Sequence, residues 1–349
     1  MKSSAFWKIL KNPLGAVSIG LIVLFVVISI LGYIITPDSS PSSNTMNLAM
    51  ANAPMGTEVL MLYSPSESCS ESSALEMWFF GDACPTRITP VAEVSSDGGM
   101  YREYLGPGEE QGEWTEIVEG QYIQEYTYLL GADKYGRDLL SRLILGGRVS
   151  IAVGFISVFI SLLIGVPLGA AAGYFGGWVD KSVMWLVNVV WSIPTLLMVI
   201  ALTFVLGKGF WQVFVAVGLT MWVEVARVVR GQVMGLRKME FVEAAKVLGF
   251  SSSRIIWKHI LPNAWAPVIV ISAANFASAI LMESGLSFLG IGAQPPIPSW
   301  GGIIRDHYAY IITGEAHLSV LPGLCIMLLV LSFMVLGNTL RDALDVRSA

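Results

Sequence analysis

The side chains able to do chemistry in this sequence are few and widely separated. Its three histidines are too scattered for a metal site or a catalytic triad: His259, His307 and His317. The one Lys-Ser pair near glycines, Lys181-Ser182, follows Asp180 and does not match the Gly-rich loop whose backbone amides cradle phosphates. No spacing suggests paired carboxylates or a Ser-His-Asp arrangement. These residues predict a chain that is not itself an enzyme and that holds no cofactor or metal.

One segment does combine charge, small residues and turn signals. Residues 227–263 carry seven Lys or Arg and lie between long apolar runs, so the positive-inside rule places them in the cytoplasm. Within them, Glu243, Ala244 and Ala245 leave a flat surface beside one charge. Such a surface favours close docking of a rigid element into a groove of another protein. A solvated cytoplasmic loop helix is the alternative interpretation.

The local sequence predicts how that surface is positioned. Residues 239–248 have a helix-forming composition, and Gly249 stands where a left-handed helix stop is expected. Residues 251–253 are serines that can cap a second helix, which Leu261-Pro262-Asn263 ends or kinks at the membrane. The segment is thus predicted to be a short helix, a glycine turn and a ramp into the next apolar run.

The composition as a whole indicates a helical integral membrane protein. Of 349 residues, 54% are apolar and 13% charged, so charge is too sparse to cover a soluble protein of this size. Residues 37–130 hold fifteen acidic against two basic residues, whereas the rest hold nineteen basic against eleven acidic. An acidic outer block and a basic inner remainder are typical of a spanning protein. Basic residues without aromatic interleaving do not indicate nucleic-acid binding.

Six apolar runs are long enough to cross a membrane. They are residues 13–35, 149–173, 182–206, 210–226, 264–290 and 318–340. No small-residue cleavage site follows the first run, so it is predicted to be a retained span with residues 1–12 in the cytoplasm. Alternation then places the tail, residues 342–349, on the same side. Residues 131–341 form the main transmembrane domain, which contains the other five spans.

Residues 37–130 differ from the rest, because they contain no run long enough to span. Short alternating stretches at 100–105 and 114–118 predict a small β-rich extracytoplasmic insert, with residues 38–57 as a linker. Cys69 and Cys84 both lie in it and form a candidate disulfide, with two free thiols as the alternative.

The segment after the insert, residues 131–148, predicts an amphipathic interfacial helix. Its leucines would face the lipid, and its charged residues Arg137, Asp138 and Arg142 would lie on the opposite side. Glycines recur in the following run at positions 165, 169 and 173, and such small faces let spans pack closely against each other or a partner.

Charged residues within spans are functional candidates because they are costly in lipid. Glu283 lies in the fifth predicted span and is a candidate for the pathway or its gate, with a helix-packing carboxylate as the alternative. A proton-coupled carrier would show a chain of such groups. Beyond this span, the proline-rich residues 294–301 predict a rigid outer loop near the pore mouth.

Four ordered blocks carry a resemblance to a known family. Glu243-Ala244-Ala245-x3-Gly249-x11-Leu261-Pro262 resembles the EAA loop of permease subunits of ABC importers. The other blocks narrow the resemblance to the C-type permease of the dipeptide/oligopeptide family: GADKYGRDLLSR (131–142), LSFLGIGAQPPIPSWG (286–301) and LGNTLRDALDVR (336–347). It covers nearly everything outside residues 38–125. His259 replaces the general motif's Ile, as in the oligopeptide subfamily, and the insert is longer than the family's usual connection.

The resemblance implies a fold and a set of partners. The fold is an all-α polytopic membrane protein of six transmembrane helices, of the ABC type I importer kind, in the bacterial cytoplasmic membrane. The partners are a homologous B-type permease, two cytoplasmic ABC ATPases that bind ATP and Mg, and an extracytoplasmic substrate-binding protein. Residues 243–249 would be the coupling helix that receives ATPase motion, and arginines before it would pair with the ATPase, pair with lipid phosphates or fix orientation.

Two other classes compete with this interpretation. A self-contained secondary carrier or channel would conduct without ATPases. A membrane anchor would display the acidic insert as a receptor or assembly factor, and deletion of residues 45–125 would then abolish all of its function.

Overall fold

The structure is a computed structural model that describes residues 5–65, 73–82, 86–207 and 209–344. The chain forms two compact units, and each is considered by itself. The first contains residues 1–25, 150–292 and 326–349, and the second contains residues 26–149 and 293–325. Cys69 and Cys84 lie outside the described residues.

Long apolar helices dominate the chain. After a short α1 (Ala5–Lys11), the helices long enough to cross a membrane are α2 (Pro13–Ile35), α4 (Leu139–Phe175), α7 (Phe210–Leu236), α10 (Leu261–Phe288) and α13 (His317–Leu344). A bent pair, α5 (Gly177–Trp191) and α6 (Thr195–Leu206), raises the five candidates to six if it counts as one span. The prediction of a helical polytopic membrane protein is confirmed.

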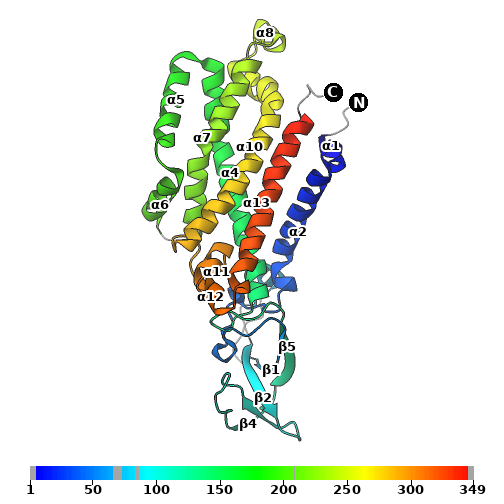
Figure 1. The fold of residues 1–349 in the computed structure, drawn as a ribbon. Coiled ribbons are helices and arrows are strands. Elements are labelled where there is room, and N and C mark those ends of the chain that lie inside the picture. Colours follow the sequence, from blue (N-terminus) through cyan, green and yellow to red (C-terminus); the bar gives the residue numbers. More distant parts are fainter. Residues whose placement is uncertain (1–4, 66–72, 83–85, 208, 345–349) are drawn as a thin grey trace. The chain divides into compact units, whose positions relative to one another are not determined.

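The third predicted span, residues 182–206, is not one straight helix. α5 and α6 meet at 90° across a break of three residues that ends at Pro194. Proline lacks the N–H that a continuing helix needs, and it disfavours helical geometry in the residue before it. In the first unit, α7 packs against α10 on one side and against α5 and α6 on another (Figure 1).

Glycines let α4 and α7 approach closely within the first unit. A Cβ at Gly165 would lie 2.7 Å from the Trp222 carbonyl oxygen, and one at Gly173 would lie 2.7 Å from that of Arg230. Gly169, midway between them, faces the backbone of Ala226. These spacings form a small-xxx-small stripe, as predicted, and its partner is another helix of the same chain.

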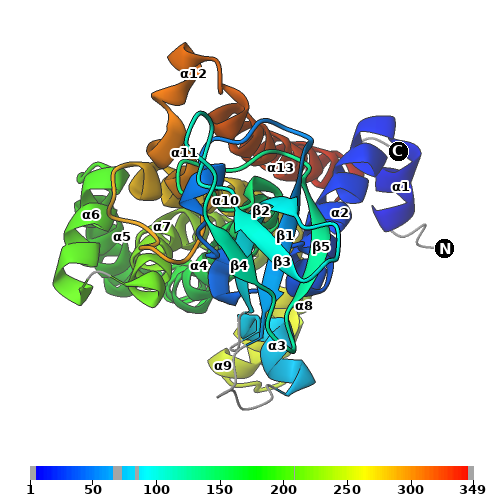
Figure 2. The ribbon, with the colours of Figure 1, turned by 90° about the horizontal axis from the view of Figure 1, so that it is seen from below.

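The second unit contains a five-stranded antiparallel sheet in the order β4-β3-β2-β1-β5, seen in Figure 2. Its strands are β1 (Thr57–Ser64), β2 (Arg87–Val94), β3 (Met100–Glu103), β4 (Trp114–Glu116) and β5 (Tyr122–Tyr128). β3 and β4 fall within the two stretches that the sequence predicts as strands. A short helix, α3 (Ala74–Phe80), lies between β1 and β2 in the sequence.

Residues 38–57 are not a linker. They form two short 3-10 helices, η1 (Pro41–Ser43) and η2 (Leu48–Met50), and Met50 and Ala53 share a buried cluster with Met61, Tyr128 and Ala132. Their backbone is also paired, because Asn52 N–H donates to the Asp133 carbonyl and Ala132 N–H donates to the Ala53 carbonyl. The segment is therefore part of the folded second unit.

The predicted interfacial helix at 131–148 is also wrong. Residues 131–138 form a turn closed by an isolated bridge between Ala132 and Asp138, and α4 then begins at Leu139 and continues to Phe175. Residues 294–299 form no helix or strand and lead into α11 (Trp300–His307), which is followed by α12 (Tyr310–Thr313). The Trp300 indole is buried and donates to the Leu143 carbonyl at 2.8 Å.

Candidate coupling site and buried polar clusters

The predicted coupling helix is α8 (Glu240–Val247), at the end of the first unit where α7 stops (Figure 1). Glu240 and Glu243 occupy its first turn and Lys246 its last, so each charge complements the helix dipole. Val242 and Ala245 face inward and are almost fully buried. They share one hydrophobic cluster with residues of α4, α7 and α10, so the inner face of α8 is part of the helical core.

A glycine turn ends α8. Gly249 has φ +75°, in the left-handed region, as the sequence predicts. Its N–H donates to the Lys246 carbonyl at 2.9 Å, and the Phe250 N–H donates to the Ala245 carbonyl at 3.1 Å. These two bonds form a Schellman motif, which satisfies carbonyls at the helix end and reverses the chain sharply.

The second helix begins as predicted, and of the two predicted outcomes at Leu261-Pro262-Asn263, an end or a kink, the end is wrong. The Ser251 hydroxyl accepts from the Arg254 N–H at 3.4 Å and caps α9 (Ser252–Arg254). Residues 255–260 then form a π-helical segment that runs straight into α10. This π-helical turn is wider than an α-helical one and lies just before Pro262, which has no N–H to donate. The helix therefore continues through the Leu261-Pro262-Asn263 sequence.

Phe250 connects the turn to this ramp. The Arg254 guanidinium lies 4.0 Å from its ring centroid, and the His259 ring stacks on it with centroids 5.6 Å apart. His259 therefore packs the π-helical segment against the residue that follows Gly249. This contact gives a structural place to a side chain whose role the sequence leaves open.

The face of α8 that points away from this core carries both apolar and charged residues, and all of them are exposed. Ala244 and Glu243 are exposed, Val247 is 88% exposed and Leu248 is 70% exposed. Such side chains at a loop tip are costly to leave in water unless a partner covers them. Of the other predicted motif residues, Leu261 is buried and Pro262 is exposed.

The arginines that precede α8 contact their own chain. Arg230 forms an ion pair with Asp180 of α5, with its Nη2 donating to Asp180 Oδ2 at 2.7 Å. Arg227 lies 3.6 Å from the centroid of the Trp191 ring and donates to Asn188 at 3.3 Å. Both contacts join α7 to α5.

Glu283 is buried inside the first unit. The Ser150 hydroxyl of α4 donates to its Oε2 at 3.2 Å, and the Ser287 hydroxyl, one turn along α10, donates to its Oε1 at 2.6 Å. The carboxylate therefore joins α4 to α10. It is 1% exposed.

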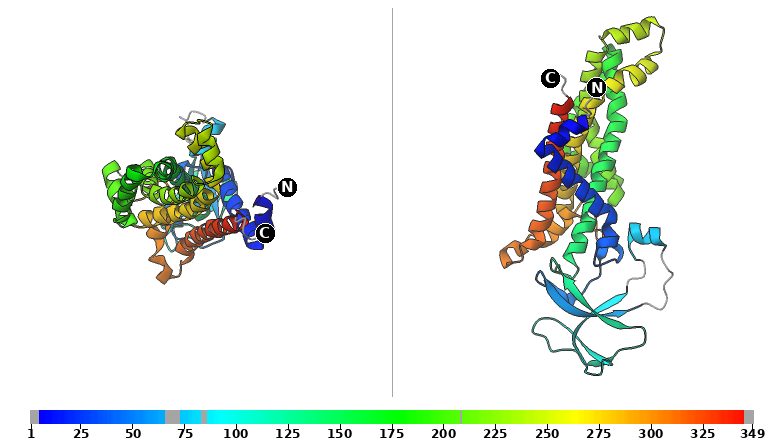
Figure 3. Two further views of the ribbon diagram at one scale, coloured as in Figure 1. Left: turned by 90° about the horizontal axis from the view of Figure 1, so that it is seen from above. Right: turned by 90° about the vertical axis from the view of Figure 1, so that its right-hand side faces the viewer.

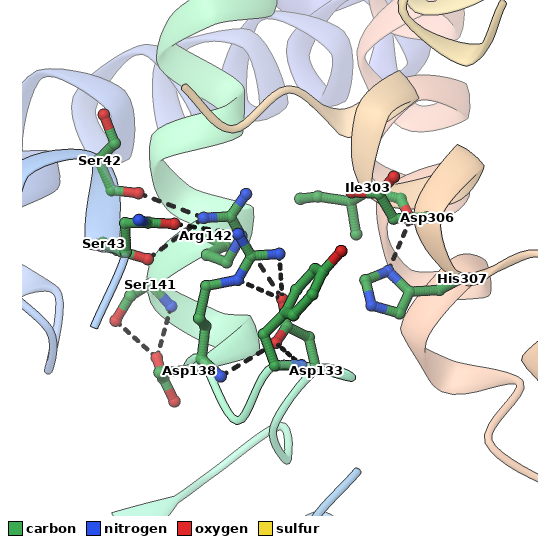
Figure 4. A network of polar contacts seen from close by, with 12 residues as sticks. Ser42, Ser43, Asp133, Asp138, Ser141, Arg142, Ile303, Asp306 and His307 are labelled. Atoms are coloured by element: carbon green, nitrogen blue, oxygen red, sulfur yellow. Dashed lines mark hydrogen bonds and ion pairs between the residues drawn. The ribbon is translucent and has the colours of Figure 1, made fainter. Parts of the chain in front are cut away.

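A second polar cluster lies in the second unit around Asp133 (Figure 4). Its carboxylate accepts from the Tyr135 and Arg137 backbone N–H groups at 2.8 and 3.0 Å, and it pairs with the Arg137 guanidinium at 2.6 Å. Arg142 reaches it at 3.9 Å and donates to the Ser43 carbonyl at 3.3 Å. The charged residues predicted to face away from the lipid, Arg137, Asp138 and Arg142, are thus buried, and the two arginines pair with Asp133.

Two neighbours of this cluster have shifted acidity. Burial raises the pKa of the Asp138 carboxyl, although hydrogen bonds from Ser141 oppose the shift. Burial lowers the pKa of His307, whose Nδ1 donates to the Ile303 carbonyl at 2.8 Å. A cavity of about 390 Å³ adjoins the cluster and is lined by Arg137, Arg142 and residues of α11. Within the described part of the chain, no three His, Cys, Asp or Glu side chains are grouped closely enough to hold a metal ion.

The long apolar helices of this bundle are those of an integral membrane protein. Residues 165–348 match the family described as the binding-protein-dependent transport system inner membrane component. The chain belongs to that family, and the resemblance found in its motifs is confirmed. It is an integral membrane permease, and the ATPase of such systems is a separate subunit.

The chain is similar along most of its length to several permeases. It is 36% identical to the glutathione transport system permease protein GsiD of Pectobacterium atrosepticum, over 70% of this chain and 81% of that one. The dipeptide permease DppC of Alkalihalophilus pseudofirmus is 41% identical over 62% of this chain and 70% of its own. The oligopeptide permease OppC of Haemophilus influenzae is 39% identical over 68% and 75%.

The sequence did not reveal the Asp133 cluster as a buried site. An available signal was the pattern Asp-x3-Arg-x4-Arg at 133, 137 and 142, because an acidic residue at a tight turn can pair with a basic residue four positions later. Burial of the set depends on the 3-10 segments at 41–50, which the sequence presents as a linker.

Proposed function

We propose that this chain forms half of the translocation pathway of an ABC importer for peptides or a related small solute. Its relatives carry names that specify dipeptides, oligopeptides and glutathione, which supports a peptide-like cargo. In the proposed assembly it pairs with a homologous B-type permease, two cytoplasmic ABC ATPases that bind ATP and Mg, and an extracytoplasmic substrate-binding protein. The termini and residues 227–263 face the cytoplasm, and the insert, residues 37–130, faces outward.

In this proposal α8 receives ATPase motion and transmits it to the spans. The observation that carries the proposal is that one face of α8 is buried and the other is exposed. Val242 and Ala245 are packed in the helical core, while Ala244, Val247 and Leu248 are exposed. A rigid body that is fixed on one side can push on the core when its free side is moved. The Schellman turn at Gly249 holds the angle between α8 and the ramp into α10.

Ala244→Arg tests this role. Because Ala244 is exposed, we expect the variant to insert and fold normally but to lose uptake, with ATPase activity no longer coupled to transport. The measurement compares peptide uptake and ATP hydrolysis by the reconstituted importer in proteoliposomes. Ser253→Arg, which adds the same charge in the same loop but off α8, is the matched control. Full uptake by the Ala244 variant would exclude the coupling role.

We also propose that Glu283 takes part in gating, because its carboxylate joins α4 to α10. Support comes from its hydrogen bonds with Ser150 and Ser287. Glu283→Ala leaves both hydroxyls without this acceptor, at a cost of about 1–3 kcal/mol, and should reduce uptake. Glu283→Gln keeps an acceptor but removes the charge, and we expect it to be as impaired as the Ala variant. Normal uptake by the Gln variant would mean that the residue only packs helices.

A further inference from the structure

The helix α3 (Ala74–Phe80) is apolar on nearly every side yet is not part of a core. None of its residues is buried, and Leu75 is 67%, Phe79 54% and Phe80 73% exposed. Its one charged residue, Glu76, is held at the helix start, where its carboxylate accepts from the Ser73 N–H at 3.0 Å in a capping box. Such a helix in water would leave a contiguous apolar patch uncovered.

α3 is fixed to the end of α2 that leads into the insert. The Trp78 indole donates to the Ile30 carbonyl at 2.6 Å. Arg148 donates to the carbonyls of Trp78 and Phe79 at 3.0 and 3.3 Å, and its guanidinium lies 5.3 Å from the centroid of the Tyr33 ring. These contacts hold α3 beside residues 30–33 of α2. The right-hand view of Figure 3 shows α3 in cyan near this end of α2.

The chain leaves α3 through a close approach to the same region. Gly81 has φ +85°, and a Cβ there would lie 2.7 Å from both the Ser39 carbonyl oxygen and the Tyr33 ring. Asp82 N–H donates to the Ser39 carbonyl at 2.8 Å. Side-chain contacts within α3 and backbone contacts just after it therefore both hold α3 against the end of α2.

The level at which α3 is held matches a membrane interface. The 23 residues of α2 extend about 35 Å at 1.5 Å per residue, slightly more than the ~30 Å hydrocarbon core of a bilayer. Ile30 lies five residues before the end at Ile35, or about 7 Å. Trp78 is thus at the depth where tryptophans concentrate, with an apolar ring and a bonded N–H.

The exposed face of α3 continues an exposed apolar face of α2. Val27, Ile30 and Ile34 of this span are 44%, 48% and 67% exposed. A hollow of about 320 Å³ between the two helices is lined by Ile34, Met77 and Trp78 among others. A surface shared with a membrane span and set at its interfacial end is suited to lipid.

The geometry points to α3 as an interfacial anchor that inserts Leu75, Phe79 and Phe80 into the leaflet bordering the insert. Its occupant is phospholipid, whose acyl chains cover the apolar side chains while Trp78 lies among the headgroups. The anchor holds the sheet of the second unit close to the membrane. It does not depend on the identity of the transported solute or on coupling through α8.

Depth measurement on the full chain in nanodiscs of phosphatidylethanolamine and phosphatidylglycerol tests the proposal. A nitroxide is attached to Phe80→Cys after Cys69, Cys84 and Cys325 are replaced by Ser, and its collisions with oxygen and with a water-soluble nickel chelate are compared. We expect high oxygen and low nickel accessibility. Val118→Cys, at a 64% exposed position of the insert outside α3, should show the opposite pattern.

Two results would overturn the proposal. A nickel-accessible label at position 80 would mean that α3 lies in water, and a label shielded from both reagents would mean that protein covers it. A second measurement needs no substitution. Phospholipid carrying a photoreactive diazirine in its acyl chain should label residues 75–80 of the unaltered protein, and labelling of α2 without α3 would equally exclude the anchor.

Discussion

Residues 131–142 and residues 239–250 are both short, charged segments beside long apolar helices, yet their side chains are buried in opposite patterns. In the first, the residues Asp133, Arg137 and Arg142 are all less than 6% exposed. In the second, Val247 and Leu248 are mostly exposed. The difference shows that charge near a membrane span need not face water and that an apolar loop residue need not belong to a core.

The two patterns have different physical causes. A buried charge is tolerated only when its partners replace the lost water, and Asp133 meets this condition with backbone and guanidinium donors at 2.6 to 3.0 Å. The apolar residues of α8 have no such reason to stay exposed within this chain. A partner that covers them would remove this cost, so the first segment serves the fold, and the second is the surface that we propose for docking of the ATPase.

The largest effect should come from Asp133→Asn. The substitution removes the negative charge between Arg137 and Arg142, so both buried guanidinium groups lose the carboxylate that pairs with them. Breaking a buried pair in this way costs about 3–5 kcal/mol. We expect a lower thermal unfolding midpoint for the purified protein and a lower yield in the membrane.

A matched control is the pair between Arg305 and Asp306, joined at 3.0 Å but with both side chains more than 20% exposed. Asp306→Asn should cost less than about 1 kcal/mol, as partly exposed pairs do. Equal unfolding midpoints for the two variants would contradict the view that the 131–142 segment is a structural clamp.

Features that depend on local sequence were predicted well. Apolar length identifies α2, α7, α10 and α13, and the glycine position identifies the stop at Gly249. Both follow from properties of a few consecutive residues: the length of an apolar run, and the freedom of a residue without Cβ to adopt positive φ. The motif blocks identify the family for the same reason, because each is contiguous.

Features that depend on distant partners were not predicted. Residues 38–57 read as a linker because their serines and prolines favour turns, and the core that buries Met50 comes from residues distant in the sequence, such as Met61 of β1 and Tyr128 of β5. The charges at 137 and 142 read as a water-facing side because helical periodicity cannot show that Asp133 and the Ser43 carbonyl lie opposite them. The 90° break before α6 shows that hydropathy measures apolar length but not straightness.

An intermediate effect is expected at Gly249. A left-handed conformation costs a β-branched residue about 1–2 kcal/mol, and nothing lies within 4 Å of the Cβ position, so Gly249→Val acts through the backbone alone. Gly249→Asn is the matched control because asparagine tolerates positive φ. Uptake by the reconstituted importer should fall in the Val variant and be largely kept in the Asn variant. Equal loss in both variants would indicate that coupling requires the absence of any side chain at position 249, and not the left-handed turn itself.

The smallest effect on stability should come from the outer face of α8, and it sharpens the comparison most. Val247→Ser and Leu248→Ser alter side chains that are 88% and 70% exposed, so the free energy of unfolding should change by no more than about 0.5 kcal/mol. Uptake should nevertheless fall, because the proposed ATPase contact loses apolar area. Val242→Ser, at a fully buried position of the same helix, should instead destabilise the protein. If the exposed variants unfolded as readily as the buried one, the outer face would belong to the core, and the contrast between the two segments would disappear.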